Sequence, residues 1–482
     1  MRFRVHNENA SITVREVPLL IKKWGLLAAA AILVFSLAAC GSKGDKSASE
    51  GSSSPAASGS ASASSDSSSG SGETVTLKFL NISEYLDSAE FKSFLERFEA
   101  KYPNIKVDPV SVPHEQYINK RNIMLASGEQ VDLLWGNGVE QFDAINKGFL
   151  MPLDDVAKEA GIDMSKDFGD FKPDKDGKYY RFPIQQNNWM LYYNKKVFDD
   201  AKVPYPDPKV PMTWDEMADV AQKITNLSGK DKVYGMFYNN WGMYFYGYGS
   251  QLTNGKFYTD DGKVNINAPE FKRSLEWMND VMNVKKAAMP IAEFIQNNTD
   301  FLSYWNGNYG MVVGAQWYAQ LAATKKDKFP RDWKAGIAPM PVPKEMAGKH
   351  MNWSSIDSLA IPKNSKHAKE ALILAKEYVS DYTLSTGALP MYTKVAKDKY
   401  FQDLANALKD DDITLDQVTY LFGGDPNVVN VAEKPVLGAP QEYESTFLDI
   451  ISQYYTGAKS VDEVLNEVKE KVDAAIQEQK NQ

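Results

Sequence analysis

Four tryptophans lie in segments whose neighbours suit the binding of a sugar ring. Each is flanked by Gly, Asn, Gln or Ser at an expected strand end or loop: Trp135, Trp241, Trp317 and Trp353. A flat indole offers an apolar face to the C–H groups of a sugar, and nearby amides and carboxylates can bond its hydroxyls. The pattern predicts a carbohydrate-binding surface. Packing of the same rings in a core is the alternative, and it is the expectation for Trp214 and Trp277, which fall in helical patterns.

Signatures of catalysis and of metal binding are missing from the sequence. It contains no G-x-S-x-G elbow, H-E-x-x-H helix, phosphate-binding loop or dinucleotide fingerprint. With one cysteine and four histidines, we expect no metal site and no cofactor. The paired carboxylates of a glycosidase need proximity in space rather than a fixed spacing, so a tethered carbohydrate-active enzyme remains an alternative to a non-catalytic binding protein. A binder of a non-sugar solute such as a peptide is the third possibility.

The length and charge of the chain indicate its number of compact units and exclude one class of partner. The 482 residues carry a formal net charge of −9, with a pI of about 5.3. An acidic balance argues against a nucleic-acid partner. The length predicts two or three compact units, and we expect a monomer.

The N-terminal segment has the features of an export signal. Lys22 and Lys23 precede an apolar run, Leu26–Phe35, which is too short for a bilayer span of about 20 residues. The sole cysteine, Cys40, follows Leu-Ala-Ala and resembles the lipobox of bacterial lipoproteins, in which that cysteine is acylated. We therefore expect a signal peptide over 1–39 and a lipid anchor at Cys40 that holds the protein on the outer side of the cell membrane.

A tether is expected next, over 40–73. Fifteen of the residues in 41–72 are serine, a composition that cannot bury enough apolar surface to fold. From Thr74 the chain alternates strand and helix patterns, beginning with the strand Thr74–Leu80 and the helical spacing of Phe91, Phe94 and Phe98. This predicts an α/β fold with mainly parallel sheets, in which ligands bind at the carboxyl ends of strands.

Two loops at such strand ends are candidates for ligand contact. They are Asn81–Ser88, which contains Tyr85, and Trp135–Glu140. Farther along, Thr213–Glu216 and Ser460–Glu463 have the S/T-x-x-E pattern of a helix capping box. The apolar stripe from Val461 to Ile476 then predicts a long helix packed on a core.

Several segments from about Thr74 to the C-terminus resemble one family. They are Phe98–Val107, Ala126–Trp135, Phe182–Lys195, Thr213–Glu216, Gly310–Trp317 and Trp333–Pro341. In this order they resemble the family 1 extracellular solute-binding proteins, the capture subunits of ABC sugar importers. The departure at Val131, where proline is usual, is minor.

The resemblance implies a two-lobed periplasmic-binding-protein-like fold with the ligand between the lobes. It places the N-terminal lobe at 74–185 plus 356–388 and the C-terminal lobe at 188–352 plus 389–482. The chain would cross between the lobes near 185–188, 353–356 and 388–391. It further implies delivery of a carbohydrate to the membrane permeases of an ABC transporter.

Ligand contacts carry over only in part. Trp317 matches the stacking tryptophan of the family, and Asn187 matches a position on the first crossing where the family places a carboxylate. Trp135 and Asn137 occupy a loop that contacts ligand in the family. The remaining expected contacts, carried by looser local matches, are Tyr85, Gln186, Trp241, Trp353 and Asp357.

Overall fold

The computed structural model describes residues 74–169, 171–324, 331–385, 388–423 and 428–481; the expected signal peptide, Cys40 and the tether lie outside these residues. The described strands are β1 (Val75–Ile82), β2 (Ile105–Val112), β3 (Leu133–Gly136), β4 (Phe182–Asn194), β5 (Tyr234–Phe237), β6 (Tyr309–Ala315), β7 (Ala335–Pro339), β8 (Met351–Ala360) and β9 (Val429–Ala432). They form one connected path in the order β2-β1-β3-β8-β4-β6-β5, with β7 joined to β4 and β9 joined to β8.

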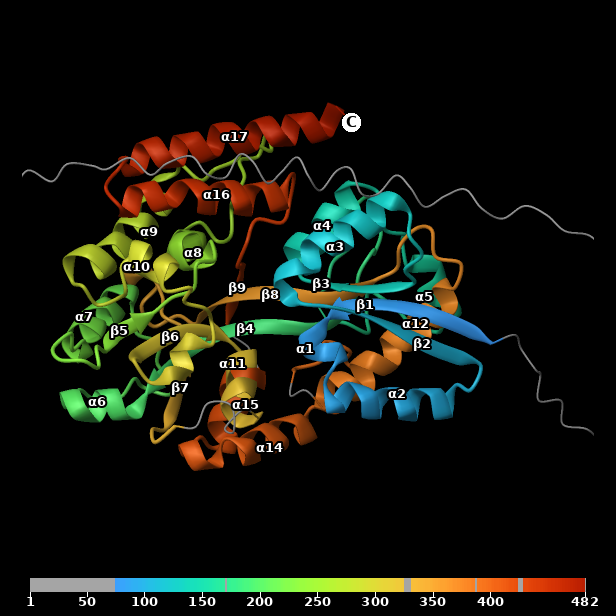
Figure 1. The fold of residues 1–482 in the computed structure, drawn as a ribbon, viewed down its shortest axis with the longest axis horizontal. Coiled ribbons are helices and arrows are strands. Elements are labelled where there is room, and N and C mark those ends of the chain that lie inside the picture. Colours follow the sequence, from blue (N-terminus) through green and yellow to red (C-terminus); the bar gives the residue numbers. More distant parts are fainter. Residues whose placement is uncertain (1–73, 170, 325–330, 386–387, 424–427, 482) are drawn as a thin grey trace, which may run out of the picture. The chain divides into compact units, whose positions relative to one another are not determined.

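The N-terminal lobe is built on parallel pairing of β1 with β2 and with β3. Its helices are α1 (Ser83–Leu86), α2 (Ala89–Lys101), α3 (His114–Ser127), α4 (Gly138–Asn146), α5 (Asp154–Glu159), α12 (Ala368–Glu377), the π-helix η4 (Tyr378–Tyr382) and α13 (Thr383–Ser385). As its spacing predicts, α2 buries Phe91, Phe94 and Phe98, and the Ser88 side chain caps its first turn. Figure 1 shows β1, β2 and β3 with helices on both sides of them.

The C-terminal lobe contains β5, β6 and β7 with most of the helices. These are α6 (Lys195–Ala201), α7 (Trp214–Ile224), α8 (Met243–Leu252), α9 (Pro269–Asn279), α10 (Ile291–Gln296), α11 (Trp317–Thr324), α14 (Asp398–Ala407), α15 (Leu415–Gly423), α16 (Pro440–Tyr455) and α17 (Val461–Asn481), with the π-helix η1 (Asp280–Val284) and the short 3-10 helices η2 (Ser303–Asn306), η3 (Lys344–Met346) and η5 (Lys409–Asp411). Both capping boxes form, with Thr213 bonded to Glu216 and Ser460 to Glu463. The apolar stripe of α17 is buried as predicted.

Two long strands connect the lobes. Residues 182–188 of β4 pair with β8, and residues 189–194 of the same strand pair with β6 and β7. In the same way β8 pairs with β9 over Met351–Ser354 and with β3 over Ser358–Ala360. A third segment lies against β4 where Met391 N donates to Ile184 O at 3.2 Å.

The expectation of mainly parallel sheets is wrong in one respect. Although the α/β class holds, β4 and β8 run antiparallel to every strand they border except β9. The physical reason is that β4 carries the chain from the N-terminal lobe to the C-terminal lobe and β8 carries it back, so the two neighbouring strands run in opposite directions. The sheet is therefore mixed, and parallel pairing is kept at β1–β2, β1–β3, β5–β6 and β8–β9.

Two apolar cores flank the crossing strands. One surrounds Leu77, Phe79 and Leu359, and the other surrounds Tyr192, Val312 and Phe447, all fully buried. The expected lobe boundaries at 185–188 and 352–356 remain predictions. Among the described residues, no helix is both long and apolar enough to cross a membrane.

Candidate functional site

A row of polar side chains lies where β4 and β8 cross between the lobes. Gln185 pairs with Asp357 and Asn187 with Ser355, and paired residues on neighbouring strands project to the same side. Gln185 Nε2 donates to Asp357 Oδ2 at 2.9 Å, and Asn187 Nδ2 donates to Ser355 Oγ at 3.4 Å. These four residues, which we call the crossing floor, bring together the predicted contacts Asn187 and Asp357.

Gln186 does not belong to the crossing floor. Successive side chains of a strand point to opposite faces, so Gln186 projects away from Asn187. Its Nε2 donates instead to Ser354 Oγ at 2.9 Å. Both residues are expected ligand contacts, and a ligand held on one face of the strands would meet only one of the two side chains.

The crossing floor carries a buried acidic group. Asp357 is 5% exposed. Burial raises the pKa of its carboxyl to about 7, hydrogen bonding by Asn187 and Gln185 opposes the rise, and the charges of Glu433 and Glu140 add to it. Burial likewise raises the pKa of Glu433, whose Oε2 accepts from Trp189 Nε1 at 2.5 Å. Glu433 was not among the predicted contacts, and no local sequence pattern points to it.

Aromatic rings from the N-terminal lobe border the floor. Tyr85 and Trp135 meet edge-on with ring centroids 6.1 Å apart, and Trp135 packs on Tyr117 at 5.7 Å. Trp135 is 6% exposed, whereas Tyr85 is only partly buried. Burial raises the pKa of the Tyr85 phenol, and the charge of Asp357 adds to the rise. Tyr85 therefore offers the accessible ring, and Trp135 supports it.

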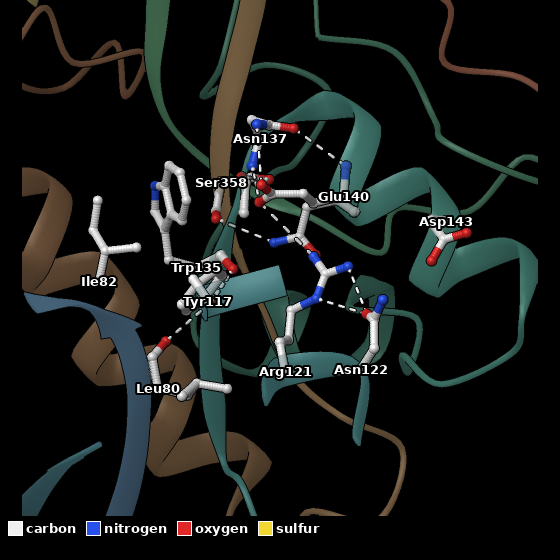
Figure 2. Close-up of polar contacts among 12 residues, drawn as sticks. Leu80, Ile82, Tyr117, Arg121, Asn122, Trp135, Asn137, Glu140, Asp143 and Ser358 are labelled. Atoms are coloured by element: carbon white, nitrogen blue, oxygen red, sulfur yellow. Dashed lines mark hydrogen bonds and ion pairs between the residues drawn. The ribbon is translucent and has the colours of Figure 1, made fainter. Parts of the chain in front are cut away.

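Asn137 begins α4, directly after β3. Its Oδ1 accepts from Glu140 N at 3.2 Å, while Glu140 Oε2 accepts from Asn137 N at 3.2 Å, so the pair forms a capping box. Figure 2 shows this box beside Trp135. The location is the carboxyl end of a strand, as predicted.

A pocket opens beside Asn137. It has a volume of about 180 Å³ and is lined by residues that include Asn137, Phe142, Ser354, Ser355, Glu433 and Lys434. It lies along the edge of β8 between the part paired with β9 and the part paired with β3. The pocket is thus bordered by segments of both lobes.

A partly exposed aromatic cluster stands on the C-terminal lobe. Trp317 begins α11, and its ring centroid lies 6.1 Å from Trp241, 5.4 Å from Phe301 and 4.5 Å from Tyr318. Trp317, Trp241 and Phe301 are intermediate in exposure, while Tyr318 is fully buried. The parallel strands β5 and β6 end at Phe237 and Ala315, shortly before Trp241 and Trp317, so the segments that follow them share one edge of the sheet.

Unpartnered amides accompany this cluster. Among the described residues, neither polar atom of the Gln316 side chain has a hydrogen-bond partner, although the residue is 1% exposed. The same holds for Oδ1 of Asn188, Asn239 and Asn240. Gln316 N donates to Asn188 O at 3.0 Å, which ties the cluster to the crossing strands. Buried amides without partners are rare and costly, so they mark places where a ligand or water completes the bonding. In the sequence, Asn188, Asn240 and Gln316 each directly precede a tryptophan.

Trp353 is not a surface residue, contrary to expectation. It is 1% exposed, stacks on Trp214 at 5.7 Å and donates from Nε1 to Gly247 O at 3.1 Å. A Cβ added at Gly247 would lie 2.1 Å from its ring. Side chains of β8 alternate between its two faces, and that of Trp353 lies on the face covered by α8. Trp353 therefore belongs to the core together with Trp214 and Trp277, which are buried as predicted.

The fold is shared with known binding proteins. An ABC substrate-binding protein from Listeria monocytogenes in complex with cycloalternan superposes with a TM-score of 0.69 at 18% identity, over 84% of this chain and 100% of that one. UgpB from Mycobacterium tuberculosis in complex with glycerophosphocholine gives 0.64 at 17% identity, over 85% and 100%. A putative binding protein of Brucella abortus is 23% identical over 402 residues, covering 80% of this chain and 89% of its own length.

These matches establish the two-lobed periplasmic-binding-protein fold. The family model for the bacterial extracellular solute-binding proteins matches residues 83–387. That span begins directly after β1 and holds β2 to β8, and it includes both the crossing floor and the aromatic cluster. The chain therefore belongs to the bacterial extracellular solute-binding proteins, which serve ABC transporters.

Proposed function

We propose that this solute-binding protein captures a neutral carbohydrate between its lobes and delivers it to the permease of an ABC transporter. The observation that carries the proposal is the partly exposed pair Trp241 and Trp317 beside the amide of Gln316, which has no hydrogen-bond partner within the described part of the chain. Indole faces suit the C–H surface of a sugar, and a primary amide can both donate to and accept from its hydroxyls.

The acidic side chains near the crossing strands favour a neutral solute over a phosphate ester. Asp357 and Glu433 are buried at the crossing strands, and Glu140 lies near enough to raise the pKa of Asp357. A phosphate group entering here would be repelled by the ionised form of these acidic side chains where water is excluded, although Arg181 and Lys434 line the adjoining pocket. Sugar hydroxyls can instead donate to the same oxygens. The expected solute therefore differs from the glycerophosphocholine bound by the Mycobacterium tuberculosis relative.

The proposal includes hinged closure of the lobes. The boundaries are those expected from the sequence, with crossing segments at 185–188, 353–356 and 388–391. A ligand that contacts Trp317 on one lobe and Tyr85 on the other favours the closed arrangement by its contacts with both.

Membrane anchoring is a separate part of the proposal. It rests on the lipobox ending at Cys40 and on the serine-rich segment 41–72. Lipidation would keep the capture subunit at the cell surface, facing outward, while the tether leaves the lobes free to meet the permease.

A ligand panel on the full chain, extracted from membranes in detergent, tests the proposal. The panel contains maltose, maltotriose, D-mannitol, alpha-D-tagatose, glycerol 3-phosphate, glycerophosphocholine and a tripeptide. We expect a neutral sugar or polyol to raise the melting temperature, because ligand at 100 times its Kd adds about 2.7 kcal/mol to the folded state. The bound sugar should be recovered intact by chromatography.

Stabilisation by the phosphate compounds or the peptide alone would overturn the carbohydrate assignment. Cleavage of the sugar by the purified protein would instead favour the alternative of a tethered carbohydrate-active enzyme.

A further inference from the structure

Helix α3 directs a charged side chain and a tyrosine hydroxyl into the N-terminal lobe, one turn apart. Tyr117, Arg121 and Met124 project inward from α3 and are 1%, 0% and 1% exposed. A fully buried arginine among apolar residues carries a large desolvation cost unless its neighbours compensate it. The position of these two polar groups therefore calls for a functional reason.

Tyr117 holds the end of β3. Its hydroxyl donates to Trp135 O at 2.5 Å and lies 3.4 Å from Leu80 O, near the end of the parallel neighbour β1. Its ring also packs edge-on against the Trp135 indole. Because Trp135 supports the accessible ring of Tyr85, the hydroxyl of Tyr117 fixes the backbone from which that support projects.

Arg121 contacts the other end of the turn Trp135–Glu140. Nε and Nη2 donate to Asn122 Oδ1 at 3.2 and 3.0 Å, and Nη1 lies 3.8 Å from Glu140 Oε2. Glu140 is 4% exposed, and its carboxylate holds both Asn137 N and, at 3.3 Å from Oε1, Asn137 Nδ2. Figure 2 shows the sequence of contacts from Arg121 through Glu140 to Asn137, with Tyr117 reaching Trp135 from below.

We propose that Tyr117 and Arg121 are positioning residues of the ligand site, which hold the turn Trp135–Glu140 from behind and so set where Asn137 and the Tyr85–Trp135 pair face the ligand. The inference rests on the proposed function, because it takes Asn137 and Tyr85 as ligand contacts. Arg121 places its positive charge 3.8 Å from the Glu140 carboxylate, which accepts from Asn137 N and Nδ2, and neither Arg121 nor Tyr117 touches the solute itself.

The test combines a structural readout with a binding readout on the full chain. The variants are Arg121→Met, Arg121→Lys, Tyr117→Phe and Glu140→Gln, with Arg97→Met as the matched control. Arg97 pairs with Asp381 on the surface of the same lobe. Hydrogen–deuterium exchange is followed for peptides spanning 133–146 and, as an internal reference, 461–481.

We expect Arg121→Met and Tyr117→Phe to speed exchange in 133–146 at least about tenfold and to leave 461–481 unchanged, with Arg121→Lys restoring most of the protection. Arg97→Met should change neither peptide. If Arg121→Met does not fold, Glu140→Gln removes the same ion pair from the other side with little change in volume. Unchanged exchange in 133–146 for Tyr117→Phe and for the variants that break this ion pair would overturn the proposal.

Binding of maltotriose supplies the readout that a purely structural role would not move. Arg121→Met should weaken maltotriose binding about tenfold in the native background and less than twofold when Asn137 is already alanine, because the effect passes through Asn137. Equal losses in both backgrounds would overturn the positioning role. If the unmodified chain fails to bind maltotriose, that failure counts against the proposed sugar, and the exchange result alone decides the role of Tyr117 and Arg121.

Discussion

Gln185 donates to Asp357 at 2.9 Å and thereby joins the two strands that cross between the lobes. The contact places a buried carboxyl, with a pKa raised by burial to about 7, at the centre of the proposed hinge. No other predicted contact combines a position shared by both lobes with a titratable group. The properties of Asp357 therefore lead to the first prediction.

Stability should depend on pH through Asp357. Its folded-state pKa of about 7 exceeds the ordinary 3.8, so the folded chain binds this proton more tightly than the unfolded chain. The free energy of unfolding should fall as pH rises from about 4 to about 7 and stay reduced above that range. Asp357→Asn cannot ionise and should be the more stable protein at pH 8, by about 1 kcal/mol or more. Urea denaturation at pH 5 and pH 8 measures this.

Asp108→Asn, at an exposed position of β2, is the control for the pH experiment. It should follow the pH dependence of the unmodified chain. If Asp357→Asn shows the same pH dependence of the free energy of unfolding as the unmodified chain, another group is responsible.

Trp317 should contribute to affinity more than to stability. Trp317→Ala removes a partly exposed ring and should weaken sugar binding by about 2 kcal/mol or more, a loss of roughly 30-fold. Trp353→Ala, in the core, should instead lower the free energy of unfolding by about 3–5 kcal/mol. Calorimetric titration and thermal melting distinguish the two. Full sugar affinity in Trp317→Ala would rule out the stacking role.

Replacing Gln316 should affect stability and sugar affinity in opposite directions. Its buried amide lacks partners among the described residues, and such a group costs about 1–3 kcal/mol. Gln316→Met keeps the approximate shape without the amide, so the sugar-free protein should melt at the same or a higher temperature while sugar affinity falls. A lower melting temperature with unchanged affinity would mean that the amide has a purely structural role.

Ligand should bring the lobes together. Spin labels on cysteines placed at Lys92, exposed on α2, and Gln402, exposed on α14, report the distance between the lobes. We expect a shorter and narrower distance distribution with the stabilising sugar. Identical distributions at saturation would favour a rigid site. A second pair of labels within α17, at Glu463 and Glu478, should not change in either case.

Cys40 should determine membrane association. Cys40→Ala removes the sole thiol of the chain and so the expected site of acylation. One acyl chain gives only marginal binding, and stable anchoring requires two. When expressing cells are fractionated, we expect the variant in the soluble fraction rather than the membrane, or with its signal uncleaved. A variant that is processed and retained like the native chain would exclude Cys40 as the anchor.

Local patterns in the sequence determined elements of both lobes. The strand expected at 74–80 is β1, the Phe91–Phe98 spacing forms α2, and the stripe from Val461 to Ile476 is buried on α17. In each case the hydrophobic periodicity, and for the two helices a capping serine, is encoded within a short stretch of chain, so neighbours in sequence suffice. The segments that resemble the family likewise located the loops that carry Asn137 and Trp317.

Only the tertiary structure decided which of the expected contacts can act together. Trp353 and Trp317 have similar local sequences, yet Trp353 is enclosed by Trp214 and Gly247 whereas Trp317 keeps an accessible ring. Glu433 reaches the crossing floor from a distant strand, and Arg121 reaches Asn137 through Glu140 from another helix. Burial, charge compensation and the pKa of Asp357 depend on groups far apart along the chain, and their proximity is fixed by the crossing of β4 and β8 rather than by any local pattern.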